Sequence, residues 1–323
     1  MKNLTFKNTF LGLALFTAIS FAISYAFAAA SGDNKPFPDA VLAKLEKRLN
    51  GKLLPMHQEK HWDMTEVVTV DVKTGSTNVV LEESPDEEIH AQLDGYATPD
   101  TKFETVQDGN NVSIRVDGGS GIRWNFSGHS DPNVHEGDKN IGVSKQELKL
   151  KILMPEKYRG HVKLQTGSGD VSSNNATYQE LEIDTGSGDI RIHDLTSDKL
   201  MIKTGSGDVA LSGTVADLAA HTGSGEVRLK KIKGEKLEIT TASGDISLDR
   251  ADFNSIRTSA ASGEVRIKLP GESSRWSAKA SSASGEIHTN LPEANKSEKQ
   301  MSVGKGPSKV DASTSSGDIS ITL

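Results

Sequence analysis

Apolar and polar residues alternate along most of the chain beyond residue 160, on both sides of a recurring Ser-Gly-acid triplet. The residue after the acid is Val or Ile in every copy, and the residue eight positions before the acid is also apolar. A period of two on both sides of a glycine turn is typical of two β-strands that share one buried face. The pattern therefore predicts a strand, a tight turn and a second strand in each copy.

The triplet recurs at a nearly constant step. The first steps are 19 residues long (170 to 189, then 189 to 208), and two longer steps near the C-terminus indicate insertions. The glycines and acids of the copies are Gly169 and Asp170, Gly188 and Asp189, Gly207 and Asp208, Gly225 and Glu226, Gly244 and Asp245, Gly263 and Glu264, Gly285 and Glu286, and Gly317 and Asp318.

One strand pair cannot bury its apolar face alone, whereas stacked copies bury a continuous interior. The repeat therefore predicts an all-β fold, a single parallel β-solenoid (β-helix) with coils of about 19 residues. Right-handed coiling is expected because parallel crossovers strongly prefer that hand. A third apolar column, which includes Ala176, Leu195 and Ile232, predicts three sides to each coil.

The solenoid is expected to span 66–323, with regular repeats over 161–323. The part before them, 66–160, is less regular, and a polar insertion at 118–142 interrupts it. Four segments of this part alternate as strands do: 70–81, 89–93, 112–116 and 148–152. At the other end, Ile319–Leu323 is expected to form an exposed final strand, which would allow end-to-end self-association.

The N-terminal region has the features of a targeting segment. Residues 1–30 combine a short positive start, an apolar stretch at Leu11–Ile23 and small residues at the end, as in a cleaved signal peptide. An uncleaved anchor is the alternative, since Thr9–Ala30 is long enough to span a bilayer. In the following segment, 31–65, an amphipathic helix is predicted over 38–50, where it could cap the solenoid.

The composition of the chain excludes several classes of function. The 323-residue chain has no Cys, which excludes disulfides, thiol catalysis and Cys-based zinc sites. Its net charge of −7 becomes −9 without Lys2 and Lys7 (−7 − 2), so the positive field that nucleic acid binding needs is missing. Beyond residue 30 no stretch approaches 18 apolar residues, so no direct membrane insertion is expected after signal cleavage.

Two segments carry a resemblance to a known family. The run Leu148–Pro155, followed by Val162–Val171 and the later Ser-Gly-acid rungs, resembles the bacterial β-strand-repeat domains of unknown function that are labelled putative adhesins. The resemblance covers roughly 66–323, and the insertion at 118–142 departs from it. It implies a protein that is exported or attached to the envelope, and it offers no catalytic residues to carry over.

The acid column is the most prominent chemical feature. Stacked carboxylates about 4.8 Å apart repel one another, and calcium bound between rungs would relieve this. A second source of relief lies two residues after the acid, where Arg191, Arg228 and Arg266 place a basic group on every second rung. The arginines favour a structural ladder over a row of cation sites, and no cofactor is predicted.

Histidine marks two weak candidates for a metal site. His129, Asp131 and His135 gather in the long polar loop and are suitable ligands for a divalent metal, although loop histidines are usually only solvated. His57 and His61 would share one face of a helix, but Pro55 and the strand that begins near Val67 argue against a helix there. We therefore predict no metal site from the sequence.

Taken together, these features predict an exported, non-enzymatic β-solenoid that acts as an interaction or adhesin module of the cell envelope. It would be periplasmic, secreted or on the cell surface, with a protein or a cell-surface glycan as partner. One alternative is a carbohydrate-active β-helix enzyme, which would need a local break in the regular acid column. The other is an envelope stress-response protein that binds a membrane sensor or a peptide.

Overall fold

The computed structural model describes residues 53–118, 123–128, 141–292, 295–297 and 299–323. The larger of two units spans Pro55–Ser120 and Leu148–Leu323. The smaller unit contains an antiparallel pair, β7 (Arg123–Gly128) and β8 (Ile141–Gln146). The predicted signal peptide, 1–30, and the predicted helix, 38–50, lie outside the described residues.

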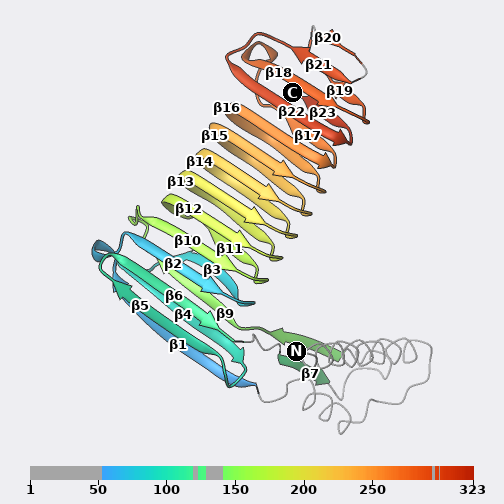
Figure 1. Ribbon diagram of the computed structural model, residues 1–323. Coiled ribbons are helices and arrows are strands. Elements are labelled where there is room, and N and C mark those ends of the chain that lie inside the picture. Colours follow the sequence, from blue (N-terminus) through green and yellow to red (C-terminus); the bar gives the residue numbers. More distant parts are fainter. Residues whose placement is uncertain (1–52, 119–122, 129–140, 293–294, 298) are drawn as a thin grey trace, which may run out of the picture. The chain divides into compact units, whose positions relative to one another are not determined.

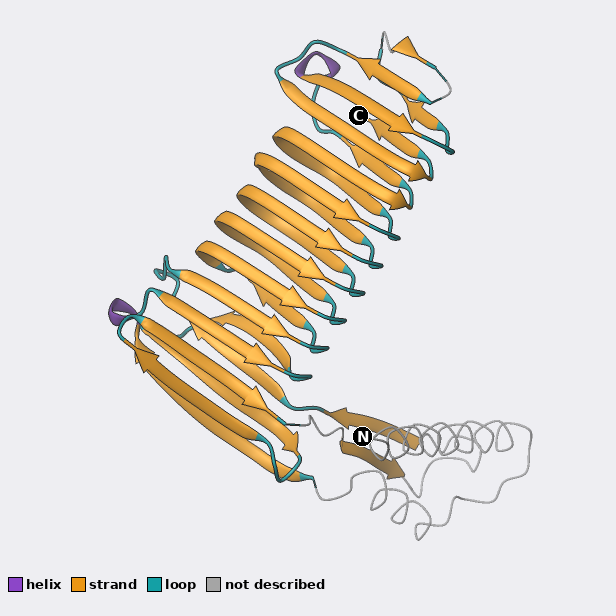
Figure 2. Ribbon diagram, viewed as in Figure 1, coloured by secondary structure: helices purple, strands orange, loops and turns teal. Residues whose placement is uncertain are grey.

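The larger unit is a stack of parallel rungs, as the repeat predicts (Figures 1 and 2). Before each turn, Leu181 pairs with Leu200, Leu200 with Leu218 and Leu218 with Leu237. Each long strand runs from one Ser-Gly-acid turn to the next. The strands of the regular part are β10 (His161–Thr166), β11 (Val171–Asn174), β12 (Thr177–Thr185), β13 (Ile190–Thr204), β14 (Val209–Thr222), β15 (Val227–Thr241) and β16 (Ile246–Ser262).

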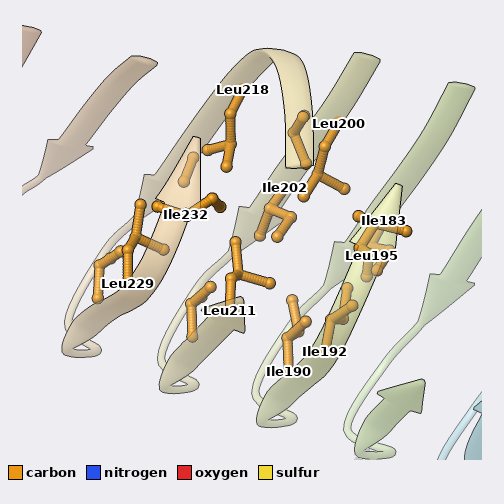
Figure 3. Close-up of a cluster of buried hydrophobic side chains, with 14 of the residues drawn as sticks. Ile183, Ile190, Ile192, Leu195, Leu200, Ile202, Leu211, Leu218, Leu229 and Ile232 are labelled. Atoms are coloured by element: carbon orange, nitrogen blue, oxygen red, sulfur yellow. The ribbon is translucent and has the colours of Figure 1, made fainter. Parts of the chain in front are cut away.

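The alternating apolar residues form the core between the two faces of the stack. Figure 3 shows Ile183, Ile202, Ile192 and their neighbours projecting into this interior from successive rungs. The third column is buried as well, including Leu195 at 1% exposure. Each fully buried Leu or Ile stabilises the fold by about 1.5–3 kcal/mol relative to an exposed position.

A second corner lies five residues after each acid from Asp170 to Asp245. Here the backbone is left-handed at Asn175 (φ 51°), Asp194 (φ 53°), Lys231 (φ 49°) and Arg250 (φ 58°), and Gly213 (φ 135°) takes this place in the third rung of the series. A left-handed residue turns the chain sharply within an otherwise extended strand. This column of corners recurs once per rung and was not predicted from the apolar pattern.

At the N-terminal end of the larger unit, spatial order departs from sequence order. β2 and β3 pair with β10 and β11, while β6 and β9, which come later in the chain, pair with the other side of β2 and β3. Antiparallel strands then extend the sheet, β5 paired with β6 and β4 paired with β9, and β1 pairs with β4. The bounds are β1 (Leu54–Asp63), β2 (Thr69–Thr74), β3 (Asn78–Glu83), β4 (Glu88–Ala97), β5 (Lys102–Asp108), β6 (Asn111–Asp117) and β9 (Lys149–Met154).

The C-terminal end shows the same departure. β22 lies between β16 and β18, and β23 lies between β17 and β19, so the last rung in sequence is not the last in space. The antiparallel β21 pairs with β18, and β20 pairs with β21. The bounds are β17 (Val265–Lys268), β18 (Trp276–Ser282), β19 (Ile287–Thr289), β20 (Asn295–Lys296), β21 (Gln300–Val303), β22 (Ser308–Ser316) and β23 (Ile319–Thr322).

The prediction that Ile319–Leu323 forms an exposed final strand is therefore wrong. Its strand, β23, has a partner on each side. Between β17 and β18 the chain leaves one rung position empty, and the last segment of the chain later occupies that position. In the last rung in space, β18 also pairs with the antiparallel β21, and end-to-end self-association stays a prediction.

The all-β prediction is confirmed, while right-handed coiling stays a prediction. The described residues contain two short 3-10 turns, η1 (Met64–Glu66) and η2 (Ser273–Arg275), and no α-helix. Among them, no helix has the length and apolar character to cross a membrane.

Candidate functional site

Each Ser-Gly-acid turn is built from backbone contacts to the rung below it. The buried Thr204 accepts a hydrogen bond from the Gly207 N–H at 3.0 Å, and Thr185, Thr222 and Thr241 do the same for their own turns. A Cβ on Gly207 would lie 1.8 Å from the Gly188 carbonyl oxygen. Glycine is therefore required here by the close approach of two backbones.

The acid side chains link one rung to the next. The N–H of Asp189 donates to Asp170 Oδ1, and the N–H of Asp208 donates to Asp189 Oδ1, both at 3.0 Å. The same bond starts the column at Asn78, which accepts from Asp170. The other described bonds of this kind run from Glu226 to Asp208, from Glu264 to Asp245 and from Glu286 to Asp318.

Asp and Glu differ in what they do in this column. In every such bond the acceptor is an Asp or an Asn. No hydrogen bond of this kind reaches the side chains of Glu226 or Glu264 among the described residues, although each has an Asp in the next rung. The shorter Asp carboxylate can thus bond to the neighbouring backbone, whereas both Asp and Glu pair with the arginines.

The arginines bridge acids of adjacent rungs. Arg191 Nη2 lies 2.6 Å from Asp189 Oδ2 and its Nη1 lies 3.9 Å from Asp170 Oδ2. Arg228 pairs likewise with Glu226 and Asp208, and Arg266 with Glu264 and Asp245. Each guanidinium thus faces two carboxylates, which lowers the repulsion along the column.

The exchanged order of the last rungs keeps this alternation intact. In sequence order, Arg266 and His288 come before Ser320, so two basic rungs would be neighbours. In space, Arg266 pairs with Ser320, and Ser320 pairs with His288, which lies 3.3 Å from Glu286. A basic side chain therefore occupies every second rung from Arg191 to the end of the stack.

A groove runs along the stack beside the turns. It has a volume of about 650 Å³ and extends over consecutive rungs. Its lining includes the exposed Lys203, His221 and Thr240, and the small residues Gly223, Ala242 and Ala261 that begin three turns, which we call its floor. The groove is hollow because the first residue of each of these turns has little or no side chain. We call it the axial groove.

A second cluster of ionisable side chains lies on the outward face of β1 and β4. Alternate residues of β1 place His57, Glu59 and His61 on this face, beside His90 of β4. His57 pairs with Asp94. The two imidazole rings of His61 and His90 have centroids 6.0 Å apart. We call this set, with Asp86 and Glu88, the histidine-acid face.

His90 lies at the centre of this face with only 14% of its side chain exposed. Its Nε2 lies 2.9 Å from Asp86 Oδ1, and its Nδ1 lies 3.3 Å from Glu59 Oε1. Glu59 Oε1 also accepts a bond of 2.8 Å from Gln92 Nε2. Asp86 Oδ1 further accepts bonds of 2.9 Å from the Ser84 hydroxyl and from the Glu88 N–H.

These contacts shift the ionisation of the face in opposite directions. Hydrogen bonds from His90, from the Glu88 backbone and from Ser84 lower the pKa of Asp86 to about 2. Burial alone would lower the pKa of His90, but the bonds to Asp86 and Glu59 and their charges outweigh it and raise that pKa. The hydrogen bond to Asp94 and its charge raise the pKa of His57.

The structure describes only one of the two pairs of histidines that were candidates for a metal site. His129, Asp131 and His135 lie outside the described residues. His57 and His61 do lie on one face, but on a strand rather than a helix. Sequence reasoning missed the trio Asp86, Glu88 and His90. Its only indication in the sequence is that residue types able to bind a metal stand at alternate positions.

Comparison with known proteins places the chain in a family. No curated protein matches the sequence. A putative adhesin from Bacteroides fragilis is 17% identical, with 85% of this chain and 99% of that one covered and a TM-score of 0.46. A putative lipid binding protein from Parabacteroides distasonis is 16% identical, with 84% and 97% covered and a TM-score of 0.47. The profile of the Toastrack DUF4097 family matches residues 67–322, and the chain therefore belongs to that family.

Proposed function

We propose that the protein is an exported, non-enzymatic module of the cell envelope that binds an extended partner along its rungs. The observation that carries this proposal is the axial groove, which continues over several rungs and is lined by polar side chains such as Lys203 and His221. An extended protein segment or a cell-surface glycan would meet similar groups at each inter-rung spacing of about 4.8 Å.

The acid column gives little support to the enzyme alternative. A catalytic pair of carboxylates would differ in environment from its neighbours. In the described column, the acids repeat one pattern of backbone bonds and arginine bridges from rung to rung. We therefore propose that the column is a structural ladder, which calcium binding to the wild-type chain would contradict.

A binding experiment tests the groove. The exposed Ala242 and Ala261 of the floor can be changed to Gln, which fills the groove without entering the core. Ser243→Gln is a matched control, because this residue is exposed, adjacent in sequence and outside the groove lining. We expect the wild type and the control to bind isolated envelope fractions, and the double groove variant to lose that binding.

The nature of the partner follows from the same assay. Binding that disappears after protease treatment of the envelope fraction indicates a protein, and binding that disappears after glycosidase treatment indicates a glycan. Equal binding by the groove variant and the wild type would refute the groove. Protease accessibility on intact and on permeabilised cells tests export and separates the cell surface from the periplasm.

A further inference from the structure

The histidine-acid face contains three metal-ligating side chains that converge. Asp86 lies in the bend just before β4, where its Oδ1 accepts from the Glu88 N–H, and Glu88 and His90 lie on one face of β4. One ligand atom from each of the three lies within 4.8 Å of the others. Convergence of this kind within residues 86–90 needs no further folding of the chain around an ion.

His90 is also held as metal-binding histidines are. A ligating imidazole usually presents one nitrogen to the metal while a carboxylate or carbonyl binds the other nitrogen and fixes the ring. Here Nε2 faces Asp86, and Nδ1 lies 3.3 Å from Glu59 of β1. Glu59 in turn is fixed by Gln92 at 2.8 Å. The ring orientation is therefore set from the adjacent strand.

The two carboxylates of the trio have ligand atoms to spare. The hydrogen bonds that the described residues make to Asp86 fall on Oδ1, not on Oδ2. Within the described part of the chain, the Glu88 carboxylate makes no hydrogen bond or ion pair. The hydrogen-bond network around His90 is thus complete without the Glu88 carboxylate, and the network does not explain why that carboxylate lies beside Asp86 and His90.

We propose that Asp86, Glu88 and His90 bind a divalent transition-metal ion of the Zn²⁺ class, with Glu59 as the outer-sphere partner of His90. One imidazole and two carboxylates form a ligand set that Zn²⁺ accepts, with water in the open position, whereas Ca²⁺ selects oxygen ligands. Binding replaces the proton that Nε2 shares with Asp86. The site is separate from the axial groove and does not depend on it.

Titration of the full chain with Zn²⁺, followed by calorimetry, tests the site. We expect one Zn²⁺ per chain, and loss of that binding in Glu88→Gln. Glu87→Gln is the matched control, since it makes the same change next to the trio at a residue that pairs with Lys157 instead. Glu59→Gln is expected to weaken binding by about 10- to 100-fold, the usual effect of removing an outer-sphere partner.

The variants separate a metal site from a purely structural network. Glu88→Gln leaves the bonds of His90 to Asp86 and Glu59 in place, so its melting temperature without metal should match the wild type. With Zn²⁺, the wild type and the Glu87→Gln control should gain melting temperature and Glu88→Gln should not, because the ion binds the folded state. Absence of Zn²⁺ binding to the wild type, equal binding by Glu88→Gln, or Ca²⁺ displacing Zn²⁺ would each overturn the proposal.

Discussion

At the scale of single residues, the turn is determined by how closely one rung approaches the next. The second glycine of each turn has the carbonyl of the previous rung where a side chain would begin, at 2.0 Å for Gly188 and 1.8 Å for Gly225. The first glycine is less restricted, and Ala242 and Ala261 replace it in later rungs. The repeat therefore preserves one glycine strictly and varies the other.

Gly207→Ala is expected to destabilise the chain strongly. The added methyl group would lie 1.8 Å from the Gly188 carbonyl oxygen, a contact that only a backbone shift can relieve. Overpacking of this kind typically costs about 1–3 kcal/mol, and a clash with backbone belongs at the upper end. Urea unfolding measures the loss. Ser206→Ala, in the exposed part of the same turn, should stay within about 0.5 kcal/mol of the wild type, and equal stability of the two variants would contradict the packing argument.

Lys231→Asn is expected to stabilise the chain. Lys231 is exposed and has a φ of 49°, a region that costs an ordinary side chain roughly 1 kcal/mol and that Asn tolerates. Thermal unfolding should show a higher melting temperature for this variant. Lys230→Asn provides the comparison, since it makes the same exchange at an exposed residue outside the left-handed corner. A gain in both variants, or in neither, would show that the corner conformation is not strained.

The residues of the corner column show what the sequence could not predict. Asn175, Asp194 and Gly213 are residue types that favour a left-handed backbone, but Lys231 and Arg250 are not. The buried columns and the turns could be predicted because each constrains residue type in every rung. The corner constrains backbone angle more than residue type, so it left no clear pattern.

At the scale of elements, the ends of the stack are the least predictable part. Local alternation correctly indicated strands in β3, β4, β6 and β9, but not which of them would be neighbours. A parallel strand pairs as readily with a distant segment as with the next one, since the cost of closing a longer loop grows slowly. The pairing of β1 with β4, which brings Glu59 to His90, could not be predicted either, although Asp86, Glu88 and His90 lie close together in the sequence.

The C-terminal exchange did leave a trace in the sequence. The step from Glu264 to Glu286 is longer than the steps before it, as expected if the chain must cross two rung spacings. Arg266 and His288 also break the alternation of basic rungs in sequence order and restore it in space. The alternation of basic and non-basic rungs thus indicates the spatial order of the last rungs, which the alternation of apolar residues does not.

Deletion of 308–323 is expected to unfold the C-terminal rungs rather than shorten the stack by one. β18 and β19 make their parallel pairings only with β22 and β23, so the deletion removes their link to β16 and β17. Hydrogen exchange should show lost protection in β17, β18 and β19. Protection in β13 and β14 should persist, because each rung depends mainly on its neighbours.

Full protection of β18 in the deleted chain would contradict this expectation. It would mean that β18 can move to pair with β16 directly, in sequence order. Removal of Leu323 alone is the appropriate control, since it leaves β22 and β23 complete and removes one backbone bond to Asn290.

At the scale of the whole molecule, the acid column is a continuous line of charge. Acids recur at every rung from Asp170 onward, and stacked charges about 4.8 Å apart repel by about 1 kcal/mol even in water. The backbone bonds of the Asp residues and the arginines on alternate rungs offset this repulsion. Stability therefore depends on a pattern that extends through the stack and not on one ion pair.

Arg191, Arg228 and Arg266 can be replaced together by Ser, the residue that three of the arginine-free rungs carry, to test this dependence. All three arginines are about half exposed, so each bridge is worth under about 1 kcal/mol and the triple variant should lose about 2 kcal/mol. Its stability should rise with salt, because about 1 M salt screens charges beyond about 3 Å. Urea unfolding at low and high salt measures both effects.

A control with the same change in net charge decides whether the column itself is responsible. Lys203, Lys233 and Lys309 are exposed, form no ion pair among the described residues and can be changed to Ser together. If only total charge mattered, this chain would be as unstable and as sensitive to salt as the arginine variant. If the acids repel along the column, the lysine variant should instead resemble the wild type. The arginine variant alone should then gain stability from Ca²⁺ or Mg²⁺, which would replace the missing guanidinium groups between rungs.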